Sequence, residues 1–333
     1  MLPVAELHIH IEGTLEPELL VKLAARNGTW MPVLDVEELR AQYAFDGLQS
    51  FLDLHYANLR VLKIEQDFYD LASTYLTRAA AAGVRRAEIF FDPQTHLANG
   101  VPLEEVFGGL TAALSEGGKE HGISADLILC FLRDLGPAAA DAMLRASLPF
   151  RDSFIGVGLD STELGHPPAQ FADVYQMAAA EGLRLVAHAG EEAGPDYVRE
   201  ALDQLHVERV DHGVRSMEDP ELVARLRDEQ IALTVCPLSN VALRVVPDLR
   251  EHMLPGMLDA GLLATVNSDD PAYFGGYVDD NLAAVQQEFG FRDEQLARLA
   301  RNSFDASFAP EADKRRWKAE VDSWLAGQIL TSP

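Results

Sequence analysis

The chain has 333 residues, 48% of them hydrophobic, which is enough to bury the core of one large domain or two ordinary ones and excludes an intrinsically disordered protein. Its 53 acidic and 27 basic side chains give a net charge of −26. A surface of this sign repels polyanions, so nucleic acid and anionic membranes are poor candidate partners.

The N-terminal segment does not have the pattern of a secretory signal. His8 and Glu12 interrupt the first apolar run, and no stretch is long enough to cross a bilayer. Cys130 and Cys236 each lie inside an apolar run, which favours reduced core thiols over a disulfide framework. We therefore expect a soluble, cytoplasmic protein; whether it forms a homo-oligomer stays open.

Short apolar runs alternate with longer amphipathic stretches, a pattern typical of βα units. The predicted strands cover residues 4–11, 84–91, 123–132, 154–159, 183–188, 209–213, 231–235 and 262–266, with helices between them, for example at 102–121, 170–181 and 195–205. No linker or change of composition divides this series. Residues 1–333 are therefore expected to form a single (β/α)8 TIM barrel.

About 70 residues separate the first two predicted strands, more than a simple βα connection needs. Residues 17–28 read as one helix and residues 51–82 as one or two more. This helical insertion, residues 15–82, leaves the carboxyl end of the first strand, so we expect it to cover a pocket there. The alternative is an extra packing layer outside the barrel.

Five polar fragments stand where apolar runs stop, at residues 8–10, 188–191, 211–213, 236–240 and 267–271. Chemistry on a TIM barrel occurs at the carboxyl ends of its strands. Side chains two apart on a strand face the same way, so His8 and His10 both point inward. His188 ends the fifth strand and Asp269 follows the eighth, and in a closed barrel both can approach the first strand.

Three imidazoles and one carboxylate suit a catalytic zinc with one position left for water, although iron or manganese stays open. A structural alternative exists for each residue. A buried histidine is usually a hydrogen-bonded core residue, and the pair Asp269 and Asp270 can cap the segment that follows.

The remaining polar residues supply candidate acid, base and substrate ligand. Glu191 is the predicted general acid, because Gly190 permits a sharp turn that carries its carboxyl over the pocket. His212 ends the sixth strand and can hold or deprotonate a water. Asp270 points elsewhere than Asp269, which makes it a predicted substrate ligand.

Four other residues have two readings each. Ser239 and Asn240 orient Asp269 or form a simple polar turn. Tyr273 and Phe274 stack on a substrate or pack in the core. The other histidines, at positions 55, 96, 121, 166, 206 and 252, are read as core or surface residues.

The sequences HIHIEG (8–13), HAGE (188–191), DHG (211–213) and SDDP (268–271) follow one another over nearly the whole chain. In this order they resemble the adenosine and adenine deaminase family of the amidohydrolase superfamily. Segments 11–17, 90–94 and 271–277 look more like the adenine branch. The adenosine branch usually has Asp where Glu12 stands and Gly where Ser161 aligns. Glu12 is therefore expected to occupy space that a ribose needs, and Ser161 to add a side chain along the purine edge.

The resemblance implies that His8, His10, His188 and Asp269 hold zinc, Glu191 protonates the purine ring, His212 assists the water and Asp270 hydrogen-bonds the base. It implies hydrolytic deamination of adenine to hypoxanthine and ammonia in purine salvage. Adenosine, an N6-substituted adenine or another modified aminopurine is the alternative substrate. A metal-binding protein without turnover is a third reading, against which Glu191 and His212 argue.

Overall fold

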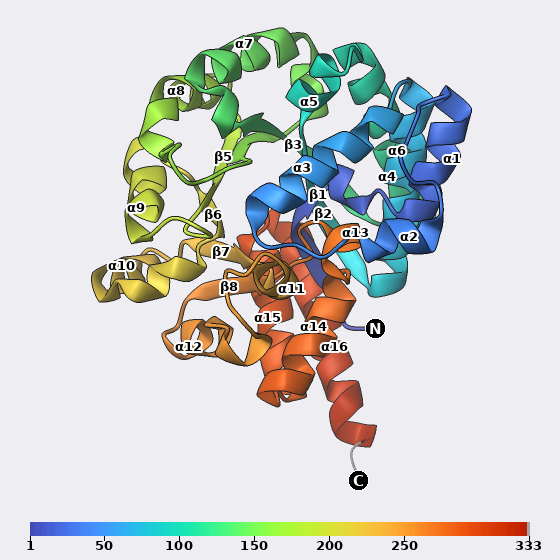
Figure 1. Ribbon diagram of the computed structural model, residues 1–333. Coiled ribbons are helices and arrows are strands. Elements are labelled where there is room, and N and C mark those ends of the chain that lie inside the picture. The colour runs from blue at the N-terminus through green and yellow to red at the C-terminus, as the bar shows by residue number, and fades with distance from the viewer. Residues whose placement is uncertain (332–333) are drawn as a thin grey trace.

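The computed structural model describes residues 1–331, with side chains to residue 328. Eight parallel strands follow one another around the sheet in the order β1 to β8, with helices between them (Figure 1). The predicted (β/α)8 barrel is therefore confirmed. Its strands are β1 Val4–His10, β2 Val84–Phe91, β3 Ser124–Leu132, β4 Gly156–Asp160, β5 Arg184–Ala189, β6 Arg209–His212, β7 Ala232–Val235 and β8 Leu263–Val266.

Each observed strand lies within two residues of its predicted start and end. The helices are α1 Pro17–Asn27, α2 Val36–Ala41, α3 Leu48–Asn58, α4 Glu65–Ala82, α5 Pro93–Ala98, α6 Leu103–His121, α7 Pro137–Ser147, α8 Ala172–Ala180, α9 Pro195–Gln204, α10 Pro220–Asp228, α11 Pro237–Ala242, α12 Leu254–Asp259, α13 Pro271–Phe274, α14 Val278–Phe289, α15 Asp293–Ala306 and α16 Glu311–Thr331. The stretch predicted as one helix at 170–181 begins with a 3-10 turn, Pro168–Phe171, before α8.

Main-chain contacts across the ends of β1 and β8 bring the first and last strands together. The amide of His10 donates to the carbonyl of Asp269 at 3.1 Å, and the amide of Asp269 donates to the carbonyl of His8 at 3.0 Å. Ile9 and Asp269 form the corresponding parallel bridge. The seam of the barrel thus runs through residues predicted to bind the metal.

Strand β1 has the alternation that the sequence predicts. Leu7 and Ile9 belong to the large apolar cluster between barrel and helices, and neither is exposed. The rings of His8 and His10 instead contact Phe90, which belongs to a small apolar cluster with residues of β3 and β5. His8 and His10 therefore face the inside of the barrel.

Proline starts the short helix at three strand ends. Pro93, Pro237 and Pro271 are the first residues of α5, α11 and α13. A proline at this position costs no hydrogen bond, because the first amide of a helix has no partner within the helix. It also keeps the preceding residue out of the helical region, so the chain turns abruptly at the mouth of the barrel.

Four helices separate β1 from β2. Helix α4 packs against α6 and β2, on the outside of the barrel. Helix α3 crosses in front of the strands in Figure 1, and five of its side chains line a cavity together with residues from the strand ends. Among the described residues, no helix is both long and apolar enough to span a bilayer.

Candidate active site

One cavity lies at the carboxyl ends of the strands. Its polar wall comes from the barrel and its apolar wall from α3 and Leu243. The lining residues are His10, Leu48, Phe51, Leu52, His55, Tyr56, Asp92, Asp160, Ser161, His188, Glu191, His212, Leu243, Asp269 and Asp270. A pocket that is partly apolar with converging polar groups is the usual form of a small-molecule site.

The four predicted metal ligands converge beside this cavity. One nitrogen or oxygen from each of His8, His10, His188 and Asp269 lies within 4.8 Å of the others. The Nε2 atoms of His10 and His188 are 3.1 Å apart, and Asp269 Oδ1 lies 3.4 Å from His8 Nε2 and 3.6 Å from His10 Nε2. Ligands bound tetrahedrally to zinc at its usual bond lengths are separated by ~3.3 Å, so the spacing fits such an ion.

Hydrogen bonds behind His8 set its tautomer. The hydroxyl of Thr234 donates its single proton to Asp211 Oδ1 at 2.8 Å. In its other hydrogen bond, of 2.9 Å, the same oxygen must therefore accept, and Nδ1 of His8 is the donor. Nε2 of His8 then carries a lone pair. It is buried and has no hydrogen-bond partner among the described residues, as expected of an atom that binds a metal.

Carboxylates also lie near the Nδ1 atoms of the other two histidines, although beyond hydrogen-bond distance. Asp160 Oδ2 lies 3.6 Å from Nδ1 of His10, and Asp211 Oδ2 lies 3.9 Å from Nδ1 of His188. Burial lowers the pKa of His10 to about 4 and that of His188 well below its ordinary value, so both imidazoles are neutral and able to bind a cation.

Ser239 is the residue that orients Asp269. Its hydroxyl donates to Oδ2 of Asp269 at 2.6 Å, which leaves Oδ1 directed at the histidines. Asn240 has a different partner, because its Oδ1 accepts from His252 Nε2 at 3.1 Å.

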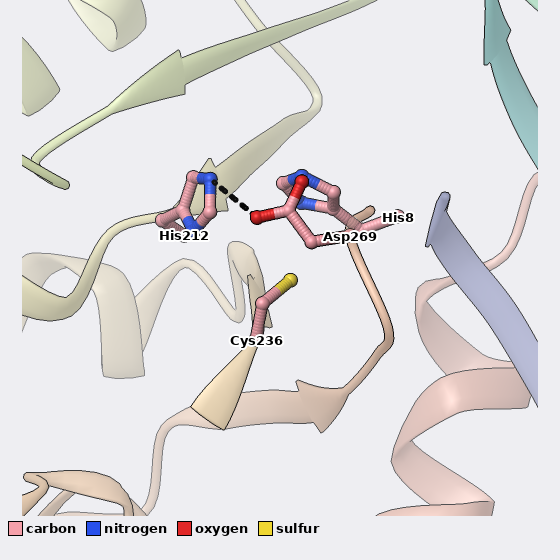
Figure 2. Close-up of side chains that lie close together, drawn as sticks. All are labelled: His8, His212, Cys236 and Asp269. Atoms are coloured by element: carbon pink, nitrogen blue, oxygen red, sulfur yellow. Dashed lines mark ion pairs between the residues drawn. The ribbon is translucent and has the colours of Figure 1, made fainter. Parts of the chain in front are cut away.

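Figure 2 shows a second arrangement, in which His8, His212 and Asp269 point toward one another and Cys236 lies beside them. Burial raises the pKa of the Cys236 thiol well above its ordinary value, and the sulfur donates to the carbonyl of Thr234. Zinc binds cysteine as a thiolate. The histidine-rich set therefore fits a metal better than the set with Cys236.

Glu191 and His212 meet at the edge of the metal site. Their side chains are 3.6 Å apart, between Oε2 and Nε2, and His212 Nε2 lies 3.8 Å from Asp269 Oδ2. Burial, followed by the charges of Asp269 and Glu163, raises the pKa of Glu191 well above its ordinary value. Burial lowers the pKa of His212 to about 3. The cavity thus pairs a carboxyl that keeps its proton with a neutral imidazole.

The loop that carries Glu191 is held by a carboxylate that the sequence did not reveal. Glu163, 1% exposed, accepts four backbone amides: Oε1 from Gly190 at 2.7 Å, and Oε2 from the amides of residues 191, 192 and 193 at 3.2, 2.7 and 2.9 Å. Gly190 has the left-handed backbone, φ 74°, that the predicted sharp turn needs.

Asp270 lies against the first strand's loop. A side chain at Gly13 would come within 2.0 Å of Asp270 Oδ1, so only glycine leaves space for this carboxyl. Burial, followed by the charge of Asp269, raises the pKa of Asp270 well above its ordinary value. The structure thus brings all seven predicted site residues into one region.

Three residues at strand ends have a strained backbone. Ser161, His212 and Asp269 have φ values of 68°, 63° and 67°, a region that non-glycine residues occupy at a cost of about 1–3 kcal/mol each. Such strain is typical of functional sites, because it aims a side chain where an extended backbone would not.

Several lining residues were not predicted from the sequence. His55 was read as core or surface, yet it is 3% exposed and faces the cavity from α3. Asp92 and Asp160 follow or end strands β2 and β4, by the same rule that selected the metal ligands. Tyr56 donates from its hydroxyl to Ser161 Oγ at 3.0 Å, linking α3 to the end of β4.

The sequence analysis predicts that Glu12 occupies ribose space, and that Tyr273 and Phe274 stack on a substrate or pack in the core. Glu12 is not among the lining residues, because its Oε1 accepts from the amide of Asp92 at 3.0 Å and from His96 Nε2 at 2.9 Å. Tyr273 and Phe274 pack against Phe51 from behind and are not themselves among the lining residues, so the packing alternative applies to both.

Comparisons with known proteins agree with this geometry. A family model described as adenosine deaminase matches residues 3–324. An adenine deaminase from Streptomyces coelicolor is 59% identical over 97% of this chain and 96% of its own. The crystal structure of an adenine deaminase from Arthrobacter aurescens, 53% identical, superposes with a TM-score of 0.97 over 98% of this chain and 100% of that one.

An amidohydrolase from Burkholderia ambifaria, whose structure contains bound zinc, is 30% identical, with a TM-score of 0.91 over 99% of this chain and 93% of the other. The match to the family model covers nearly the whole chain, and the eight-stranded barrel carries the expected residues at its carboxyl end. The chain therefore belongs to the adenosine deaminase family and is a hydrolytic deaminase.

Proposed function

We propose that this enzyme is a zinc-dependent adenine deaminase, which converts adenine and water into hypoxanthine and ammonia in purine salvage. The observation that carries the proposal is a histidine-rich metal set beside a proton-retaining Glu191, in a chain 59% identical to an adenine deaminase. His8, His10, His188 and Asp269 are the proposed ligands. When bound, the ion supplies an acidified water, since metal coordination lowers the pKa of water to about 7.

Glu191 is the proposed general acid. Addition of water to the carbon that bears the amino group disrupts the aromatic ring unless the adjacent nitrogen is protonated. A carboxyl with a raised pKa holds that proton at neutral pH and delivers it as the new bond forms.

His212 is the proposed base. Its imidazole is neutral, with Nε2 lying 3.6 Å from Glu191 and 3.8 Å from Asp269, so it stands between the metal ligands and the acid. From there it orients the attacking water and accepts its proton. The imidazolium of His212 then returns that proton to the amino group, which leaves as ammonia, and the second proton of the water restores the acid form of Glu191.

Asp270 is proposed to hold the five-membered ring, and α3 to close the site. Leu48, Phe51 and Leu52 supply the apolar surface for the face of a flat base and exclude bulk water. Zinc is favoured over harder cations because three of the four ligands are imidazoles.

The test is ammonia release by purified protein of known metal content from adenine, adenosine and N6-methyladenine. We expect adenine to have the highest kcat/KM, and Glu191→Gln to abolish most of the release while keeping the metal. Turnover of adenosine far above that of adenine would overturn the substrate assignment.

A further inference from the structure

Two buried carboxyl groups in the cavity have no role in the mechanism above. Asp92 follows β2 and Asp160 ends β4, and they are 4% and 3% exposed. Oδ1 of Asp92 and both oxygens of Asp160 lack a hydrogen-bond partner among the described residues, and both side chains line the cavity. Buried polar atoms of this kind are normally satisfied by a ligand or by water.

Asp160 is directed toward the metal site, and Asp92 lies beside it, because one oxygen from each carboxyl and one nitrogen of His10 lie within 4.8 Å of one another. Oδ1 of Asp92 has no hydrogen-bond partner among the described residues, so this atom can meet a substrate. Oδ2 of Asp160 lies 3.6 Å from Nδ1 of His10. The backbone of Asp92 is anchored from behind, since its amide donates to Glu12, whose carboxylate also binds the buried His96. Glu12 thus acts on pocket shape indirectly, by fixing the position of Asp92.

The chemistry of the substrate leaves one edge unassigned. With the amino-bearing carbon at the metal site, Glu191 at the adjacent ring nitrogen and Asp270 at N7, the N3 and N9–H edge would face the remaining polar wall, which Asp92, Asp160 and Ser161 form. A carboxyl group accepts from N9–H whether or not it is ionised, and a neutral one also donates to N3. A nucleoside lacks this N–H and carries a sugar on the same atom.

We propose that Asp92 binds the N3 and N9–H edge of the free base and thereby selects adenine over nucleosides. This inference rests on the proposed function, because it assumes an aminopurine oriented by Glu191 and Asp270. Burial, with the nearby charges of Asp160 and Glu12, raises the pKa of Asp92 well above its ordinary value. The neutral carboxyl offers one donor and one acceptor, which matches that edge of the purine.

The test compares adenine with 9-methyladenine, which lacks only the N–H and adds one methyl group. The wild type should prefer adenine by at least ~10²-fold in kcat/KM, as sites built to hydrogen-bond a substrate group do. Asp92→Ala should reduce the ratio of the two kcat/KM values to ~10-fold or less, mainly by lowering kcat/KM for adenine. Asp92→Asn should keep most of the preference, because its amide still has one donor and one acceptor.

The matched control is Asp134→Ala, which removes an exposed carboxyl outside the cavity lining and should leave the ratio unchanged. If Asp92→Ala lowers the rates on both substrates equally, or if Asp92→Asn loses the preference as completely, the inference is wrong.

A second measurement needs no variant. Hypoxanthine should compete with adenine in the wild type, and 9-methylhypoxanthine should compete at least ~10²-fold less strongly. Equal competition overturns the inference, whether or not Asp92→Ala folds. No ammonia from adenine overturns the proposed function itself, whereas equal turnover of adenine and 9-methyladenine overturns only the role of Asp92.

Discussion

Both ends of the barrel interior bury charged groups, but the two ends differ in whether other protein groups pair with those charges. Toward the amino ends of the strands, Arg209 and Glu88, neither of them exposed, form an ion pair at 2.5 Å. Arg209 also donates to the carbonyl of Leu7, and Glu88 accepts from the amide of Phe308 and from Arg86. Nε of Arg209 has no hydrogen-bond partner among the described residues, but it lies 3.5 Å from the carboxylate oxygen Oδ1 of Asp211. At the carboxyl ends, one buried atom in each of His8, Asp92 and Glu191 lacks a hydrogen-bond partner.

The difference separates structural from functional burial. Charges at the amino end neutralise one another within the protein, so their removal should affect stability. We propose that the groups at the carboxyl end are completed by an ion or a substrate, so their removal should affect turnover. The predictions below test this separation, beginning with the largest effect on activity.

Removal of the metal should abolish deamination. Dialysis of the enzyme against a chelator is expected to leave no measurable ammonia release, and one zinc per chain should restore it. Metal analysis and the rise of the unfolding temperature on adding zinc give independent readouts, because an ion that binds only the folded state stabilises it. Full activity of metal-free protein would contradict the assignment of the four ligands.

Glu191→Gln should lower kcat by about 10²–10⁴-fold, the usual contribution of a general acid. Glutamine has nearly the same shape but cannot give up a proton to the ring. Steady-state kinetics measure the change in kcat, and thermal unfolding measures the change in stability, for which we expect no large loss. The control is Glu192→Gln, which changes the next, half-buried residue of the same loop. Equal losses in the two variants would remove the special role of Glu191.

Glu163→Gln should lower kcat by ~10-fold or more, by misplacing Glu191. The amide has one accepting oxygen in place of two, so part of the set of four backbone amides loses its acceptor. Hydrogen exchange of residues 190–193 should become faster, which a change in chemistry alone would not cause. Unchanged exchange in this loop would show that Glu163 does not hold it.

Glu88→Gln should leave the kcat of the folded enzyme unchanged and lower the free energy of unfolding by about 3–5 kcal/mol, because it leaves buried guanidinium groups without their carboxylate. Denaturant unfolding measures this loss. Glu320→Gln, at the partly exposed pair with Arg85, is the control, with an expected loss of about 0–1 kcal/mol. A large loss of kcat in folded Glu88→Gln would show that charges at the amino end of the barrel also affect turnover, which contradicts the proposed separation.

The same pair predicts a dependence on pH. Burial raises the pKa of Glu88, but Arg209, Arg86 and their hydrogen bonds outweigh it, so the pKa lies below its ordinary value of 4.5. The stability contributed by the ionised carboxylate is therefore present above pH 4.5 and is lost as the pH falls through the lower folded-state value. Wild type should lose this contribution in acid, whereas Glu88→Gln should show no corresponding loss.

The fold and the convergence of the four proposed metal ligands were predictable because both follow from local pattern. Apolar runs that end in polar fragments indicate strands of a barrel, and the spacing of His8 and His10 follows from the pleat of one strand. Barrel closure then requires that His188 and Asp269 approach them. None of these steps needs knowledge of side-chain packing.

The rest depends on tertiary contacts that leave no local signature. Glu163 binds backbone amides, which nearly all residues have. The sequence around Glu163 and around its four partners therefore does not indicate these hydrogen bonds. Asp92 precedes a proline, and a lone carboxylate there is more often a turn residue than a ligand. His55 reaches the cavity only because α3 lies across the strand ends, and an insertion has no fixed register relative to the barrel it leaves.

The seam between β1 and β8 has a consequence for biogenesis. His8 and Asp269 are joined there by main-chain hydrogen bonds, although 260 residues separate them in the chain. A ribosome releases the histidines long before it releases the aspartate, so the complete set of proposed metal ligands exists only after nearly the entire polypeptide has emerged. Under this assignment, the ion can bind to all four ligands only after the barrel has closed.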